Sequence, residues 1–356
     1  MNNLIKQVSP LFVGSAIALS TFSVQPVMGA TLYNQIFIFG DSLSDAGNLF
    51  NLTGGTNPPP VFFDGRFSNG SVWSEYFAED LGLAPELWIQ DSGELITSIP
   101  RNGINFAFAG AKTDDTHITN NDQLFGLHQQ VNSFIGLLGG NTLNNPQALG
   151  VLMAGANDYF GDPLLNPQTP VENLVKEIDR LSGAGLTNIL VSNLPDLGKT
   201  PLALSFGEPV SAGLTNSIRL HNDLLKKELK KLNQANPETN LILFDFYSLF
   251  NDILDNPNKF GFINVTDSCI DLNLTPPNSI SQDFCSEDLQ DQFLFVDNQH
   301  PNTKAHRFIA DKALQTVSTP EPTTILPLGF LGMGLLTNLI SKRPSNKNKE
   351  KMTVAK

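Results

Sequence analysis

Cysteine and positive charge are scarce in this sequence of 356 residues. Only Cys269 and Cys285 occur, which is too few for a disulfide-rich scaffold and gives no zinc-type ligand spacing. Lysine and arginine number 22 against 35 aspartate and glutamate residues, so the net charge is −13 and no nucleic-acid partner is expected. His117, His128 and His221 fit no ligand spacing either, so the sequence predicts no metal site.

Tryptophan and tyrosine are also rare, at 2 and 4 residues, whereas phenylalanine occurs 25 times. With 40% hydrophobic residues, the chain can form a globular protein of one large domain or two small ones. We interpret the phenylalanines mainly as core residues, with an apolar substrate cleft as the second interpretation.

The first 30 residues are typical of a secretory signal peptide. They contain Lys6, a short apolar run at 11–19 and small residues at 29 and 30 where cleavage would occur. We therefore expect the protein to be exported across the inner membrane.

Residues 318–356 have the order of a C-terminal sorting signal. Pro320-Glu321-Pro322 precedes an apolar stretch at 325–340, and Lys342-Arg343 follow it. The stretch is shorter than the ~20 residues of a comfortable spanning helix, and a buried helix is one interpretation. The order also resembles the PEP-CTERM signal of Gram-negative bacteria and cyanobacteria, whose tail a membrane protease removes. This implies transient membrane contact through the tail and a final location in the periplasm, on the outer surface or outside the cell.

Apolar runs of strand length alternate with helical patterns along the middle of the chain. This alternation favours a mostly parallel sheet covered by helices on both faces, a three-layer α/β/α sandwich. Thr169 is the predicted N-cap of one helix, and the polar segment 264–284 is predicted to be a loop. The strands are predicted at 36–39, 105–109, 149–154, 188–192 and 241–246, and the helices at 71–81, 127–138, 170–183 and 214–232.

Ser42 follows the first of these predicted strands. Gly40 allows a sharp turn after the apolar run 36–39, which places Ser42 just past the carboxyl end of the strand. Open α/β sheets hold their ligands at that edge, so Ser42 is a candidate nucleophile. Taken alone, a serine in this position is more often a turn residue or a helix N-cap.

A second pair of polar residues follows an apolar strand predicted near the other end of the chain, at 293–296. Asp297 and His300 are three residues apart in the loop that comes next. At this spacing the imidazole can reach a serine while the carboxylate orients the other ring nitrogen, as in a catalytic triad.

These two blocks resemble those of the GDSL esterases/lipases, also called SGNH hydrolases. The letters GDSL at 40–43 match the nucleophile block of that family, and Asp297-x-x-His300 matches its last block. The stretch 65–73 (GRFSNGSVW) resembles the plant-type branch of the family, and the segment 193–198 resembles the family as a whole.

The resemblance also implies an oxyanion hole. In the family, a glycine after the second strand contributes its backbone N–H, and this role falls on Gly110, although Ala109 stands where an adjacent glycine is commoner. Asn157 follows the strand 149–154 and matches the expected amide donor, whereas an isolated asparagine there is usually a turn former. The backbone N–H of Ser42 is the third implied donor.

The resemblance implies an SGNH-hydrolase, flavodoxin-like domain at 31–317 that hydrolyses carboxylic esters without a cofactor. Ser42 is the implied nucleophile, His300 the general base and Asp297 the group that orients it. Lipids, short-chain esters and acetylated polysaccharides all stay open as substrates. The alternative is a catalytically inactive surface protein that binds carbohydrate or lipid.

Three further residues carry expectations of their own. In an exported protein Cys269 and Cys285 can form a disulfide, worth about 3 kcal/mol for a loop of that size, or stay as two free thiols. His306 is predicted to be structural, in the final helix. For His300, an unperturbed pKa of about 6.5 predicts activity that rises through roughly pH 6–7.

Overall fold

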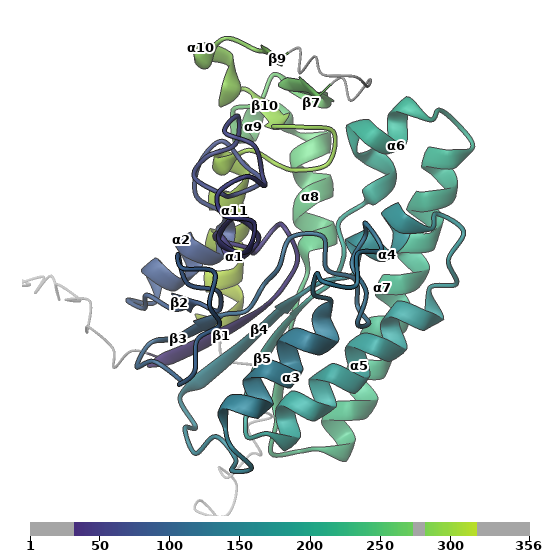
Figure 1. The fold of residues 1–356 in the computed structure, drawn as a ribbon. Coiled ribbons are helices and arrows are strands. Elements are labelled where there is room, and N and C mark those ends of the chain that lie inside the picture. The colour runs from purple at the N-terminus through teal and green to yellow at the C-terminus, as the bar shows by residue number, and fades with distance from the viewer. Residues whose placement is uncertain (1–31, 273–281, 319–356) are drawn as a thin grey trace, which may run out of the picture.

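Six short, mostly apolar segments form the central sheet of the computed structural model, which describes residues 32–272 and 282–318 (Figure 1). All neighbouring strands are parallel, and their order is β2-β3-β1-β4-β5-β6. The central strands are buried on both faces, which explains their nearly continuous apolar sequence. The strands are β1 (Gln35–Gly40), β2 (Glu86–Leu87), β3 (Gly103–Asn105), β4 (Ala148–Met153), β5 (Asn188–Ser192) and β6 (Asn240–Phe244).

Helices cover both faces of this sheet (Figure 1). Successive residues of β1 point to opposite faces: Phe37 packs in the core on one side and Ile38 in the core on the other. The core around Phe37 is closed by α3 (Leu127–Leu137), α5 (Gln168–Gly183) and α7 (Val210–Ala235). The core around Ile38 is closed by α2 (Trp73–Asp80), α8 (Phe246–Asp255) and α11 (Thr303–Ser318).

Shorter elements gather mainly at the carboxyl edge of the sheet, at the top of Figure 1. Two small strand pairs lie apart from the main sheet: β7 (Asn264–Ser268) runs parallel to β10 (Phe293–Phe295), and β8 (Ile270–Leu272) runs antiparallel to β9 (Gln282–Phe284). The prediction of a loop is therefore wrong for the described residues 264–272 and 282–284. The other short elements are α1 (Asn48–Leu52), α4 (Ala156–Gly161), η1 (Leu197–Lys199), α6 (Pro201–Ser205), α9 (Pro257–Phe260) and α10 (Glu287–Gln290).

Two predicted element boundaries are corrected by side-chain hydrogen bonds. The predicted strand 105–109 is wrong in its bounds: β3 covers Gly103–Asn105, and beyond it the side chain of Asn48, not another strand, binds the Ala107 carbonyl. Thr169 is not a helix cap, because α5 has already begun at Gln168, whose N–H is bound by the side chain of the preceding Asn166.

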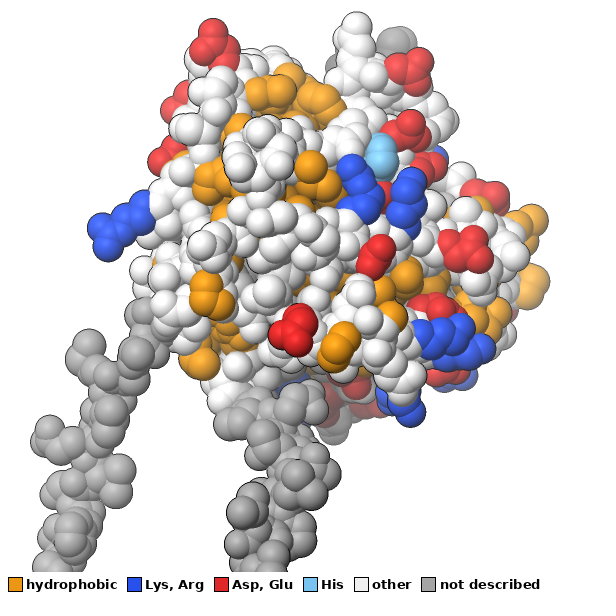
Figure 2. Space-filling view, turned by 90° about the horizontal axis from the view of Figure 1, so that it is seen from below, with side chains coloured by type: hydrophobic (Ala, Val, Ile, Leu, Met, Phe, Trp, Pro, Cys, Tyr) orange, Lys and Arg blue, Asp and Glu red, His pale blue; other side chains and the backbone are white. Residues whose placement is uncertain are grey.

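The ends of the described chain lie at the amino edge of the sheet. Leu32 stands three residues before β1, and α11 runs from the carboxyl edge down to Ser318 (Figure 1). Figure 2 shows this lower face, where acidic and basic side chains are mixed, so the excess of acidic residues forms no single patch there. Among the helices of residues 32–272 and 282–318, none is long and apolar enough to cross a membrane.

Candidate active site

Ser42 lies at the carboxyl edge of the sheet, in a tight turn after β1. A side chain on Gly40 would bring its Cβ within 2.2 Å of the carbonyl oxygen of Met153 in β4, so the close approach of the two strands requires glycine. Asp41 holds the turn, because its backbone carbonyl and its carboxylate together accept the N–H groups of residues 43, 44 and 45. The Ser42 side chain takes no part in these turn hydrogen bonds, and its hydroxyl faces the loop that follows β10.

Asp297 and His300 reach Ser42 from the loop after β10. The Asp297 Oδ1 atom accepts the backbone N–H groups of Gln299 and His300 at 2.8 and 2.6 Å, which folds the loop tightly. The Oδ2 atom lies 2.7 Å from His300 Nδ1, and His300 Nε2 lies 2.8 Å from Ser42 Oγ. The structure thus joins Ser42 to a pair of side chains more than 250 residues further along the sequence in one hydrogen-bonded chain.

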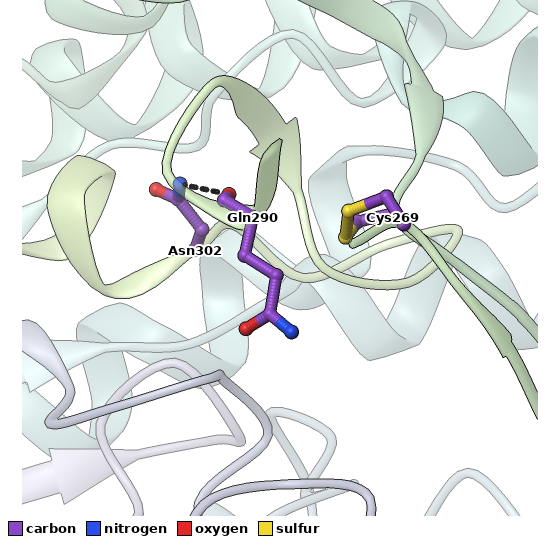
Figure 3. Close-up of a disulfide and its surroundings, with 4 residues drawn as sticks. Cys269, Gln290 and Asn302 are labelled. Carbon is purple, nitrogen blue, oxygen red and sulfur yellow. Dashed lines mark hydrogen bonds between the residues drawn. A yellow bond between two sulfur atoms is a disulfide. The ribbon is translucent and has the colours of Figure 1, made fainter. Parts of the chain in front are cut away.

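One side of the loop that carries His300 is braced by the small strand pairs. The Cys269 N–H donates to the Phe295 carbonyl, and Cys269 is joined to Cys285 by a disulfide with a Cα–Cα distance of 5.1 Å (Figure 3). On the far end of the loop, the side chain of Asn302 donates to the carbonyl of Gln290 at 3.0 Å (Figure 3). These contacts fix both ends of the loop.

The other side of the loop is held by the segment whose sequence resembles the plant-type branch. Ser68 Oγ donates to the Pro301 carbonyl at 3.2 Å, and Asn69 accepts the Thr303 N–H at 2.8 Å. The ring of Phe67 packs against the His300 imidazole with a centroid distance of 4.9 Å. Sequence reasoning noted the GRFSNG letters but missed this contact, since nothing in the local pattern indicates a partner more than 230 residues away.

The charges of the site shift the pKa values of His300 and Asp297 in opposite directions. Burial acts to lower the pKa of His300, but the Asp297 carboxylate and its hydrogen bond outweigh burial and raise that pKa above its usual value. Burial acts to raise the pKa of Asp297, and His300 with two backbone N–H groups brings it below its usual value. Burial also raises the pKa of the neighbouring Asp41 to about 7.

Asn157 contacts the short loop that contains Gly110. Asn157 is in the first turn of α4, just after β4, and its side chain donates to the Ala111 carbonyl at 3.0 Å. Gly110 has a φ of +83°, a conformation that favours glycine. Ala109 is not among the described residues with positive φ, and its side chain is buried in the core, so alanine fits where the family pattern more often has glycine.

A pocket opens beside Ser42 and His300. Asn157 lines it too, while most of its wall is apolar and comes from several separate elements. The cavity can therefore hold an apolar group with its polar end at the Ser42 hydroxyl. The apolar lining residues are Leu43, Ala156, Phe160, Pro195, Leu197, Phe246, Phe250, Phe295 and Pro301.

A family model described as GDSL-like lipase/acylhydrolase matches residues 36–313. The chain belongs to this family. The match spans the whole arrangement above, from β1 to α11, and this GDSL chain is accordingly a carboxylic ester hydrolase with the predicted α/β/α fold. Both the fold class and the enzyme class predicted from the sequence are confirmed.

Curated proteins that are similar to this chain include one that is named as a GDSL esterase/lipase. The GDSL chain is 28% identical over 295 residues to the thermolabile hemolysin of Vibrio parahaemolyticus, covering 80% of this chain and 63% of the hemolysin, less than two thirds of its length. It is 29% identical over 330 residues to a GDSL esterase/lipase of Arabidopsis thaliana, covering 80% and 91%. It is 29% identical over 258 residues to the phosphatidylcholine-sterol acyltransferase of Aeromonas hydrophila, covering 71% and 70%.

Among solved structures, a lipolytic protein of the G-D-S-L family from Veillonella parvula matches with a TM-score of 0.41 at 17% identity, covering 79% of this chain and 96% of that one. The predicted signal peptide at 1–30 and the sorting signal at 318–356 lie outside the described residues, apart from Ser318 at the end of α11. The catalytic roles of individual residues in this GDSL chain stay predictions.

Proposed function

We propose that the protein is an exported serine hydrolase that cleaves carboxylic esters through an acyl-enzyme on Ser42. The observation that carries the proposal is the hydrogen-bonded chain from Ser42 through His300 to Asp297 beside a mostly apolar cavity. This is the order of nucleophile, general base and orienting carboxylate that serine catalysis requires.

The chemistry takes place in two similar halves. His300 Nε2 takes the hydroxyl proton as Ser42 Oγ attacks the ester carbonyl, and then gives that proton to the leaving alcohol. A water molecule enters, His300 takes one of its protons, and the resulting hydroxide attacks the acyl carbon. The acid leaves as the proton returns to Ser42 Oγ. Asp297 holds the Nδ1–H tautomer and stabilises the imidazolium throughout.

Three donors would stabilise the oxyanion formed in each half. These are the backbone N–H groups of Ser42 and Gly110 and the second amide N–H of Asn157. Within the described part of the chain, neither backbone N–H makes another hydrogen bond. Asn157 uses only one of its two amide hydrogens in its bond to Ala111. Donors that have no other partner are well suited to a developing negative charge.

The lining of the cavity supports an ester with an apolar acyl group. The name of one relative, phosphatidylcholine-sterol acyltransferase, states a lipid ester as substrate, and we propose lipid esters as the first class to test here. Short-chain esters and acetylated polysaccharides are the competing classes. A panel of p-nitrophenyl esters of increasing acyl length, with phospholipid and acetylated xylan included, separates the three.

Ser42→Ala tests the mechanism. Wild type should label with a fluorophosphonate probe and hydrolyse the ester panel, whereas Ser42→Ala should do neither and keep the wild-type circular dichroism spectrum. Ser92→Ala, at an exposed loop serine, is the matched control and should behave as wild type. Near-normal hydrolysis by Ser42→Ala would refute the mechanism. A folded wild type that neither labels nor hydrolyses any ester would favour the inactive binding protein.

We further propose that the protein acts in the periplasm, on the outer surface or outside the cell. The Cys269–Cys285 disulfide supports an oxidising compartment. The mature protein from its host should lack residues 1–30 and end near Pro320. An intact mass that includes Lys356 would count against removal of the tail.

A further inference from the structure

The loop 109–111 leaves one backbone group without a partner. Of its three N–H groups and three carbonyls, every one except the Gly110 N–H has a hydrogen bond within the described residues. Gly110 is half-buried, and the next residue, Ala111, is bonded to Asn157 in the pocket wall, so this N–H lies near the site and is available for a ligand. The two other N–H groups are bound by acceptors nearby: Asp45 Oδ2 accepts from Ala109 (2.8 Å) and the Phe108 carbonyl accepts from Ala111 (3.0 Å). The three carbonyls accept from His117 at Ala109 (2.8 Å), from the Ile118 N–H at Gly110 (2.9 Å) and from Asn157 at Ala111 (3.0 Å).

The hydrogen bonds of His117 determine which of its ring nitrogens carries the proton. The backbone N–H of Thr119 points to Nδ1 at 3.1 Å, and a backbone N–H can only donate. Nδ1 is therefore the acceptor, and in the neutral ring Nε2 carries the hydrogen and donates it to the Ala109 carbonyl at 2.8 Å. Burial lowers the pKa of His117, which keeps the ring neutral.

The carbonyl that His117 binds belongs to the same peptide group as the unpaired N–H. A peptide group is planar, and the Ala109–Gly110 bond is trans, so its C=O and N–H point in opposite directions. Fixing the Ala109 carbonyl therefore fixes the direction of the Gly110 N–H. A hydrogen bond to the carbonyl also polarises the peptide and strengthens its N–H as a donor.

We propose that His117 is a positioning residue for the oxyanion hole, which aims and strengthens the Gly110 N–H by binding the opposite end of its peptide group. The ring lies directly against the loop: a Cβ on Gly110 would come within 2.1 Å of His117 Nε2. Gly110 thus has to be glycine both for its φ of +83° and to admit this imidazole. The inference rests on the proposed function, because it assigns a task to a residue in the hydrolytic mechanism.

Three variants test the inference. His117→Phe keeps a ring against the loop but removes the donor. His117→Gln keeps an N–H at the end of a side chain of similar reach, and His117→Asn places one too short to reach the Ala109 carbonyl. Thr116→Val is the matched control, because its hydroxyl bonds only Asp114 on the exposed side of the same hairpin.

The Phe variant should lose kcat on the order of tenfold, the usual loss for one hydrogen bond, with KM nearly unchanged. Its affinity for an alkylboronic acid, which forms a tetrahedral adduct with the serine, should fall by the same factor. The Gln variant should recover most of this loss, and Thr116→Val should match wild type. If the Phe variant does not fold, a slow Asn variant beside a fast Gln variant gives the same evidence.

A folded Phe variant with wild-type kcat would overturn the inference, as would Phe, Asn and Gln variants that are equally slow. The proposed function fails separately. The proposed function is refuted if the Ser42→Ala variant remains active. If Ser42→Ala is inactive and His117→Phe is fully active, only the role of His117 is refuted.

Discussion

At the scale of single residues, the imidazole of His300 is subject to opposing effects. Burial disfavours its charged form, while the Asp297 carboxylate 2.7 Å away favours it and gains further support from Asp41. The carboxylates prevail, so the pKa of His300 is raised above the value of about 6.5 that an unperturbed imidazole would have. The expectation of activity rising through pH 6–7 has to be corrected upward for this reason.

The pH profile of hydrolysis tests this correction. His300 must be neutral to accept the Ser42 proton, so kcat/KM should be low in acid and rise with pH through an inflection above 6.5. Asp297→Asn removes the main cause of the raised pKa and should move the inflection of its remaining activity down. A wild-type inflection at or below 6.5 would contradict the electrostatic account.

In the proposed mechanism Asn157 has two tasks, and substitution separates them. One amide hydrogen holds the Ala111 carbonyl, and the other is free to meet the oxyanion. Asn157→Ala should lower kcat by on the order of 10²–10³ with KM nearly unchanged, because the lost donor acts mainly in the transition state. It should also cost stability, about 1–3 kcal/mol for a buried carbonyl left unpaired. A variant with full kcat and reduced stability would leave Asn157 as a turn residue only.

At the scale of elements, the disulfide beside β7 and β10 supports the loop that carries His300. It closes a loop of 16 residues in sequence separation, and such closure is worth about 3 kcal/mol in the chain-entropy model. Cys269→Ser with Cys285→Ser should lower the free energy of unfolding by that order, measured by urea denaturation. Single-turnover hydrolysis at low temperature should persist, because the hydrogen bond from Cys269 N–H to the Phe295 carbonyl is kept. An unchanged unfolding curve would refute the contribution.

The elements also show how far the sequence could predict this fold. β5 has the predicted bounds of 188–192, since the apolar run at its centre is enough to indicate a strand buried on both faces. The prediction of Thr169 as a helix cap was wrong because the start of α5 depends on Pro167 and Asn166, which lie outside the supposed capping box. The strand β7 carries no apolar run and exists because β10 lies beside it, a pairing between distant segments that no local pattern records.

The same limit applies to the site. Ser42, Asp297 and His300 could be singled out because each follows an apolar run and because their letters match a family. Phe67 and His117 could not, since their importance comes only from contacts: one packs on an imidazole 233 residues away and the other binds a carbonyl across a hairpin.

At the scale of the whole molecule, buried histidines make the fold sensitive to acid. His221 is fully buried in α7 with one hydrogen bond, to the Tyr159 hydroxyl, and burial lowers its pKa to about 3. The unfolded chain, with a pKa near 6.5, binds a proton that the folded chain does not, so stability falls as pH drops below 6.5.

His221→Phe isolates this effect. Wild type should lose about 2 kcal/mol more than the variant between pH 7 and pH 5, measured as free energies of unfolding in urea. The test compares how the free energy of unfolding changes with pH, so the constant cost of leaving the Tyr159 hydroxyl unpaired in the variant cancels. Equal slopes would mean that folding does not lower the pKa of His221.

The course of α11 has a mechanical consequence. The helix starts at Thr303, next to the loop of His300, and its 16 residues carry the chain about 24 Å away to the opposite edge of the sheet. Leu32 leaves from that edge as well. A tether attached at either end therefore holds the molecule by the amino edge of the sheet, while Ser42 and His300 lie at the carboxyl edge. An enzyme held in this way would present Ser42 and His300 on the side away from the surface that carries it, where substrates from the surroundings can reach them.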